Sequence, residues 1–318
     1  MKQHMHYDAA DLAAVMDAGD RLGIEREDQG IFLARQLDYV KSRIYEVLTP
    51  NLTGLQLVPV STEVPEWAES FTYRTYDEVG MAKFISNYAD DLPRVDVTGT
   101  EQTLKLKSMG DAYGYSLDEM RLANAMGTNL PERKGRTARR AIDQLVNKVA
   151  LVGDEAHGFY GFTNHPNLGT TAVGGSWTAS ATTGQEILDD LLAMYDAVMV
   201  QSYDNHTPNT LAVAPTRRSA LVSKNVNTGG QWQSVWSAFQ AIHPGVSMIA
   251  STELEAAEGA GEAVMYERDV DNLSIEIPRP FEQLPTERRG LEMVIDCIAK
   301  CSGVAIYRPL ALTKATGV

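Results

Sequence analysis

Alternation of hydrophobic and polar positions predicts two β-strands in the first third of the chain. Ser70 to Tyr76 and Gln102 to Ser108 both show the two-residue repeat of a strand with two different faces. The two runs can pair as a long hairpin around Asp77 to Glu101, a segment too polar to bury much by itself. Since a two-stranded ribbon is marginally stable alone in water, we expect this arm to need a partner surface.

Spacings of three and four residues predict helices on both sides of the hairpin. One amphipathic helix is expected over Ile31 to Leu48, and Ser116-Leu-Asp-Glu119 has the capping-box pattern that begins another. Pro131 is suited to the first position of a longer helix, which we expect to end at Gly153. Between the first helix and the hairpin, the proline-containing run Leu55 to Val64 predicts an extended connection. The apolar stripe of the long helix comprises Ala138, Ala141, Ile142, Leu145, Val146, Val149 and Val152.

The second half of the chain alternates short strands with helices. A turn-rich connector from Gly158 to Gly175 precedes a second capping box, Thr183-Gly-Gln-Glu186, and another helix is expected near Pro215. This alternation predicts a small α/β layer domain. The tail from Leu291 to Leu312 is again strand-like. The strands expected between them are Thr210 to Ala214, Val246 to Ala250 and Ala263 to Tyr266.

Length and charge restrict the function classes. The 318 residues suffice for two domains or one elaborate domain, and 28 Lys and Arg against 42 Asp and Glu give a formal net charge of −14. Such a surface repels phosphate polymers, which disfavours general nucleic-acid binding. The acidic first thirty residues lack the pattern of a secretory signal, and no run approaches the ~18 apolar residues of a membrane span. We therefore expect cytoplasmic folding, with Cys297 and Cys301 reduced and buried.

Searches for catalytic and ligand-binding patterns assign no residue. The six histidines form no zinc-protease arrangement, and GxGxxG, GxxxxGK[ST] and GxSxG patterns are missing from the sequence. The adjacent carboxylates at Asp90/Asp91 and Asp189/Asp190 are expected to be solvated charge. We accordingly predict a protein that is not an enzyme and has no cofactor, metal site or catalytic residue.

Two groups of residues are candidates for contacts between subunits. A basic run on the long helix could meet phosphate, meet carboxylates of a neighbouring copy, or be a hydrated helix end, and the last two readings are favoured equally. A set of aromatic side chains lies in and beside the predicted arm, where large rings are unusual unless another subunit covers them. The basic run is Arg133, Lys134, Arg136, Arg139 and Arg140, and the aromatic set is Trp67, Phe71, Tyr73, Tyr76, Phe84 and Tyr88.

Two short motifs and the order of elements resemble the tailed-phage major capsid protein family with the Hong Kong 97-type fold. GFYGFTNHPN (Gly158 to Asn167) is similar to the turn that follows the family's spine helix, and SGVAIYRPLAL (Ser302 to Leu312) to its closing strand. The resemblance implies an α+β fold. Its parts would be an N-terminal arm and helix (1–61), an extended loop (62–109), a peripheral domain (110–175 and 288–318) with a spine helix (131–152), and an axial domain (176–287).

The resemblance also implies a function and partners. The chain would be a structural protein that assembles with itself into the pentamers and hexamers of an icosahedral shell, made and assembled in the host cytoplasm. It would enclose double-stranded DNA without sequence-specific binding and without a membrane. A separate scaffolding protein, a portal and a decoration protein are further implied partners. Some family members crosslink lysine to asparagine between subunits; Lys83 is a nominal donor here, although we expect noncovalent locking.

Two other functions stay open at this stage. An encapsulin, a cellular nanocompartment shell, shares the architecture and is distinguished by the genes around it rather than by sequence pattern. A small-molecule-binding α/β enzyme would instead need a pocket with convergent polar groups and perturbed titration.

Overall fold

The computed structural model describes residues 51–79, 96–126, 130–256 and 262–318. The chain divides into two compact units, Met1–Thr49 and Pro50–Val318, and the architecture below is that of the second unit. The helix expected over Ile31 to Leu48 lies outside the described residues.

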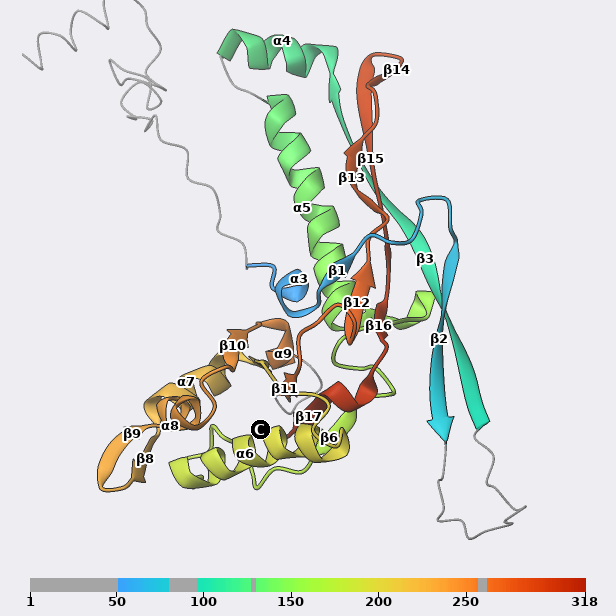
Figure 1. The fold of residues 1–318 in the computed structure, drawn as a ribbon. Coiled ribbons are helices and arrows are strands. Elements are labelled where there is room, and N and C mark those ends of the chain that lie inside the picture. The colour runs from blue at the N-terminus through green and yellow to red at the C-terminus, as the bar shows by residue number, and fades with distance from the viewer. Residues whose placement is uncertain (1–50, 80–95, 127–129, 257–261) are drawn as a thin grey trace, which may run out of the picture. The chain divides into compact units, whose positions relative to one another are not determined.

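A sheet with the strand order β13-β15-β3-β2 forms one part of this unit (Figure 1). The strand β3 pairs antiparallel with β2 on one side and with β15 on the other. A short strand, β14, also pairs with β15. The bounds are β2 (Ser70–Val79), β3 (Asp96–Ser116), β13 (Arg279–Gln283), β14 (Glu287–Arg289) and β15 (Glu292–Ser302).

The strand β3 changes partner near its middle. Its first half pairs with β2, up to Lys105 opposite Ser70. The second half pairs with β15, from Leu106 opposite Ser302 to Ser116 opposite Glu292. The predicted hairpin is therefore confirmed, but its second strand is longer than the sequence pattern indicated, because it continues into the body of the protein.

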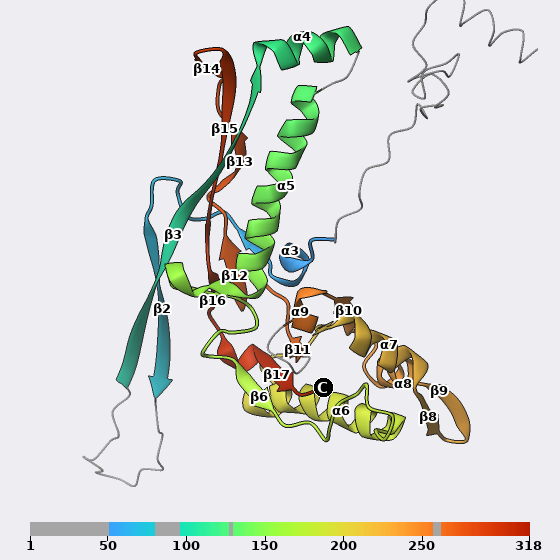
Figure 2. The ribbon, with the colours of Figure 1, turned by 180° about the vertical axis from the view of Figure 1, so that it is seen from behind.

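The long helix α5 (Leu130–Leu151) packs on β3 and β15 (Figure 2). Ala138, Ile142 and Val146 form a buried cluster with Cys297 and Ala299 of β15. The helix is confirmed within one residue at each end. The predicted apolar stripe includes residues that are not buried, because the sheet covers only one narrow face of the helix. Three stripe members are exposed: Ala141, Leu145 and Val152.

A capping box begins the preceding helix α4 (Leu117–Met126), as predicted. The backbone N–H of Glu119 donates to the Ser116 hydroxyl at 3.1 Å, and the N–H of Ser116 donates to the Glu119 carboxylate at 3.1 Å. These bonds satisfy backbone donors that the helix itself leaves open.

The connection before the hairpin contains one turn of helix, so the purely extended conformation expected over Leu55 to Val64 is wrong. In α3 (Gly54–Leu57), the backbone N–H of Gly54 donates to Asn147 Oδ1 of α5 at 2.7 Å, and Leu57 is fully buried. A tertiary hydrogen bond and a buried side chain thus stabilise a turn too short to form alone. The strand β1 (Val60–Ser61) follows and joins a three-stranded sheet with β12 (Leu273–Glu276) and β16 (Val304–Ile306).

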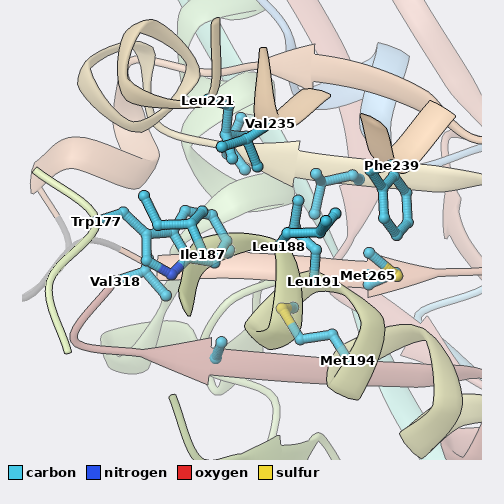
Figure 3. Packing of buried hydrophobic residues seen from close by; sticks show 14 of the residues in the cluster. Trp177, Ile187, Leu188, Leu191, Met194, Leu221, Val235, Phe239, Met265 and Val318 are labelled. Atoms are coloured by element: carbon cyan, nitrogen blue, oxygen red, sulfur yellow. The ribbon is translucent and has the colours of Figure 1, made fainter. Parts of the chain in front are cut away.

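A second sheet, of order β10-β7-β11-β17-β6, shares a hydrophobic core with three helices. The main core of the chain lies between them and includes Trp177, Leu191, Met194 and Phe239 (Figure 3). The strands are β6 (Gly169–Thr171), β7 (Thr210–Val213), β10 (Ser247–Ala250), β11 (Glu262–Tyr266) and β17 (Leu312–Thr316). The helices are α6 (Gly184–Gln201), α7 (Pro215–Ser223) and α8 (Val235–Ile242); a shorter helix, α9 (Glu253–Ala256), contacts α5 and β11.

Local signals in this half give mixed results. The capping box at Thr183 and Glu186 is confirmed, as are the strands β7, β10 and β11 and the helix starting at Pro215. The hairpin of β8 (Asn225–Thr228) and β9 (Gln231–Ser234) was not predicted. Its two-residue Gly-Gly turn has positive φ at both glycines. Such a dipeptide between two strands is a strong hairpin signal, so the sequence does contain the information for this hairpin.

The connector motif GFYGFTNHPN folds tightly onto the end of α5. The N–H groups of Phe162 and Thr163 donate to the carbonyls of Ala150 and Leu151, at 2.9 and 3.0 Å. The strands β4 (Gly153–Asp154) and β5 (Phe159–Tyr160) pair around the 3₁₀ turn η2 (Glu155–His157). A Cβ on Gly161 would lie 2.4 Å from Gly153 N and 2.5 Å from Val152 C, so only glycine fits there.

We expect Gly161→Ala to lower the free energy of unfolding by about 2–3 kcal/mol, because two backbone segments must separate to admit the methyl group. Urea denaturation of the unassembled protein measures this. Gly158→Asn is the matched control: Gly158 has φ +74°, a conformation that asparagine tolerates, and nothing lies within 4 Å of its Cβ position. Equal losses in the two variants would contradict the steric explanation.

Candidate assembly surface

The outer half of the β2/β3 ribbon has little support from the rest of the described chain. From Arg74 opposite Glu101 outward, the two strands pair only with each other among the described residues. Exposed cross-strand contacts join them: the Thr72 and Thr103 hydroxyls at 2.8 Å, and the Arg74 guanidinium and Glu101 carboxylate at 2.7 Å. Exposed pairs of this kind each contribute about 1 kcal/mol or less.

The root of the ribbon, by contrast, is fixed to the body of its own chain. The Tyr73 ring packs edge-on against the Tyr307 ring, with 4.8 Å between centroids, and the Tyr73 hydroxyl lies 3.2 Å from the Ile306 carbonyl and 2.5 Å from Gln102 Oε1, two acceptors for its one proton. Burial raises the pKa of the Tyr73 hydroxyl, and the nearby Tyr307 raises it further. The ribbon is therefore a projection from a rigid base.

The predicted aromatic contact residues occupy different environments. Phe71 and Tyr73 are partly buried at the root, whereas Trp67 is 83% exposed and Tyr76 is 65% exposed. The alternation of partly buried and exposed side chains from Phe71 to Tyr76 follows the predicted strand faces. Phe84, like Tyr88 and Lys83, lies outside the described residues. The structure thus keeps Trp67 and Tyr76 available to a partner, while Tyr73 contacts its own chain.

The predicted arginines lie apart from this aromatic group, on the first half of α5. Arg136 forms an ion pair with Glu132, and the Arg139 guanidinium is 3.8 Å from the Asp143 carboxylate and 5.8 Å from the centroid of the Phe281 ring. Arg140 is exposed. Residues of β3, β13 and α5 line a hollow beside Arg136 and Arg139, and this hollow includes no residue of the ribbon root.

Two cavities lie at the ribbon root, with volumes of about 740 and 650 Å³. Both are lined by Glu63, Tyr73, Glu276 and Tyr307. Burial raises the pKa of Tyr307; a hydrogen bond with Ser274 at 2.9 Å opposes this shift, and the Glu276 and Glu63 carboxylates add to it. The cavity walls are thus aromatic and acidic.

Pattern analysis missed Glu276 and Tyr307. Glu276 ends a four-residue strand that is buried on both faces, so no alternation marks it as unusual. Its significance depends on which side chains surround it, and these come from β1, β2 and the segment after β16. Trp232, 72% exposed on β9, was also missed, although the Gly-Gly turn next to it could have indicated a projecting hairpin.

The prediction of reduced, buried cysteines is confirmed. Cys297 and Cys301 are free thiols on β15, with 1% and 0% of their surface exposed. Burial raises the pKa of the Cys301 thiol to about 12. Both side chains act as small apolar residues between the sheet and its neighbours.

Comparison with protein families decides the identity of this fold. A family model described as major capsid protein matches residues 80–318, well over half of the chain. The chain belongs to the major capsid protein family. A search of curated proteins finds no match. Family membership implies a structural rather than an enzymatic role.

Solved structures agree with the family in their fold. The capsid of Myoviridae phage XM1 is similar over 91% of this chain and 100% of its own, with a TM-score of 0.81 and 18% identity. The capsid of a native GTA particle is similar over 89% of this chain and 96% of its own, with a TM-score of 0.61 and 14% identity. The holo-SrpI encapsulin of Synechococcus elongatus PCC 7942 is similar over 90% of this chain and 94% of its own, with a TM-score of 0.56 and 14% identity. The α+β, Hong Kong 97-type fold is confirmed, and the family match leaves the encapsulin alternative less supported.

None of the helices in the part of the chain that the structure describes is long and apolar enough to cross a membrane.

We expect Tyr307→Ala to loosen the ribbon root. Loss of the ring contact with Tyr73, worth about 0.5–1.5 kcal/mol, should speed amide hydrogen exchange in β2 and the facing half of β3 by about 2- to 10-fold. Exchange in the half of β3 paired with β15 should be unchanged. Hydrogen exchange with mass spectrometry measures both segments in one experiment. Tyr76→Ala, which removes an exposed ring from the same ribbon, serves as control; equal loosening there would argue against Tyr307 as the anchor.

Proposed function

We propose that this capsid protein is the shell subunit of a tailed, double-stranded DNA phage. Copies would join in five- and six-membered rings of an icosahedral shell that encloses the genome. The family match and the similarity to phage capsids over most of the chain support this proposal. Heterologous contacts whose rotation closes into rings require surfaces that project toward the next copy.

The ribbon is the observation that carries the proposal. Its root is paired into the body sheet through β3 and anchored at Tyr73, yet its outer half has no other described strand beside it. A two-stranded ribbon gains stability when another surface covers it. We infer that this surface belongs to an adjacent subunit, with the exposed Trp67 and Tyr76 among the contacting side chains.

The charge of the chain fits a shell that encloses DNA without binding its sequence. A formal net charge of −14 disfavours the many cationic contacts that would attach packaged DNA to the wall. The basic positions on α5 are Arg136, Arg139 and Arg140. We favour two roles for them equally: contact with carboxylates of a neighbouring copy, and a hydrated helix end. Contact with phosphate is less favoured. Assembly in the host cytoplasm with a scaffolding protein, a portal and a decoration protein completes the proposal.

The domain division also stands as a proposal. An N-terminal arm and helix (1–61), an extended loop (62–109), a peripheral domain (110–175 and 288–318) and an axial domain (176–287) describe the expected functional parts. The sheet that contains β7, β10 and β11 also includes β6 and β17, which these boundaries assign to the peripheral domain. Including 169–171 and 312–316 in the axial part gives that sheet all its strands.

A shortened ribbon tests the proposed function. Residues 77–98 are replaced by Asn-Gly, which joins Tyr76 to Gly99, a facing pair that a two-residue turn can connect. We expect the variant to keep the thermal unfolding profile of the body, because the root pairs and Tyr73 remain. It should form no closed shells, whereas the wild type forms them, as electron microscopy and sedimentation would show.

Two results would count against this function. Wild-type protein that sediments only as a compact monomer at high concentration would contradict a shell subunit. Shells formed equally well by the shortened variant would contradict a role for the ribbon in assembly. Particles isolated from their native source should contain double-stranded DNA; an enzyme cargo without DNA would instead indicate an encapsulin.

A further inference from the structure

A buried carboxylate without a partner among the described residues lies at the ribbon root. Glu276 is 3% exposed, and its Oε2 atom is buried and accepts no hydrogen bond from the part of the chain that the structure describes. The residue lines both cavities under the ribbon. An isolated buried charge is costly, by several kcal/mol, unless a donor or counter-charge compensates it. Such a group in a folded chain indicates a missing partner.

Most hydrogen-bond donors next to Glu276 are used elsewhere. Its own backbone N–H donates to the Ser302 hydroxyl at 3.1 Å, and that hydroxyl donates to the Gly303 carbonyl at 2.6 Å. Ser274 and Tyr307 share a hydrogen bond at 2.9 Å. The one proton of the Tyr73 hydroxyl is used by Gln102 Oε1 or the Ile306 carbonyl. One hydroxyl proton of the Ser274 and Tyr307 pair stays unused, yet no donor of the described residues forms a hydrogen bond with Glu276 Oε2.

The cations that line the cavities are engaged as well. Arg74 pairs with Glu101 at 2.7 Å, and Arg308 donates to Asn272 Oδ1 at 3.2 Å. The acidic lining residues outnumber these two and comprise Glu63, Glu69, Asp271 and Glu276. The described lining of the cavities thus carries an excess of negative charge, which attracts a cation.

We propose that the cavity at the ribbon root receives the ammonium or guanidinium group of a lysine or arginine from a second copy of this chain, with Glu276 as its counter-charge. Such a group supplies the N–H donors that the carboxylate lacks. The Tyr73 and Tyr307 rings in the wall add a favourable cation–π environment. The apolar stem of the incoming side chain would pack along Val64, Pro65 and Trp67.

A second copy fits the cavity better than a small ion. Two cavities of about 740 and 650 Å³ exceed the space that a single ion and its water need. The second cavity opens beside the exposed Trp67, a side chain expected to be covered by a partner. This inference rests on the proposed function, because a shell places another subunit against the ribbon of each copy.

Glu276→Gln tests the proposal through two effects of opposite sign. In the unassembled subunit, removal of an unpaired buried charge should leave the urea midpoint unchanged or raise it. In assembly, loss of the intersubunit pair should raise the protein concentration needed for shell formation by about tenfold or more. Glu276→Met is a second variant with similar volume, for which the same pattern is expected. Glu155→Gln, on the exposed turn η2, changes the net charge equally and should assemble like wild type.

Each other outcome overturns the proposal. Glu276→Gln shells that form at the wild-type concentration would show that the carboxylate has no intersubunit partner. A lowered urea midpoint in both Glu276 variants would assign the carboxylate a role within its own chain. If n-butylammonium chloride raises the midpoint of the unassembled wild type but not of Glu276→Gln, and both form shells equally, the cavity binds free cations instead.

A direct measurement distinguishes this inference from the proposed function. Electron cryo-microscopy of wild-type shells should show a lysine or arginine of another copy within about 4 Å of the Glu276 carboxylate. Shells in which no cationic side chain reaches Glu276 would overturn the inference alone. A wild-type chain that forms no shells would overturn the proposed function, and this inference with it.

Discussion

The structure depends on one strand shared between two environments. Residues 106–116 of β3 are held by β15 and covered by α5, whereas residues 96–105 pair only with β2 in the described chain. Because β3 runs without interruption from the sheet into the ribbon, the sheet fixes the direction in which the ribbon leaves the body. A loop of equal length joined by flexible ends would sample many directions and would lose more conformational entropy when a partner bound it.

Anchoring at the root has a second consequence, which concerns charge. Tyr73 and Tyr307 join the ribbon to the segment after β16, and both rings line the same cavities as the buried Glu276. The fold thereby holds an acidic, aromatic cavity ready at the place where the ribbon begins. Preorganised contacts of this kind favour association because little reordering is needed when the partner arrives. A buried carboxylate whose Oε2 has no partner among the described residues is expected to lower the stability of the single chain at Glu276.

The rest of the chain is built as ordinary, well-packed cores. The cluster around Trp177 and Phe239, the buried thiols of β15 and the close glycine contacts after α5 all act within the subunit. Substitutions there would affect folding, whereas substitutions at the outer ribbon or in the cavity would affect association. Well-packed cores tolerate extensive substitution, in keeping with a fold that this chain shares with solved structures at 12–18% sequence identity.

Sequence by itself determined the local elements. The period-two runs predicted the hairpin, the capping boxes at Ser116 and Thr183 located two helix starts, and the spacing of apolar residues located α5, because these signals depend on neighbours within a few positions. The resemblance drawn from two short motifs and the element order predicted the fold family. Tertiary structure alone decided the partner change of β3, the narrow buried face of α5, the helical turn at Gly54 and the isolation of Glu276. Each of these depends on contacts between residues far apart in the chain, and no local pattern records which side chains will meet there.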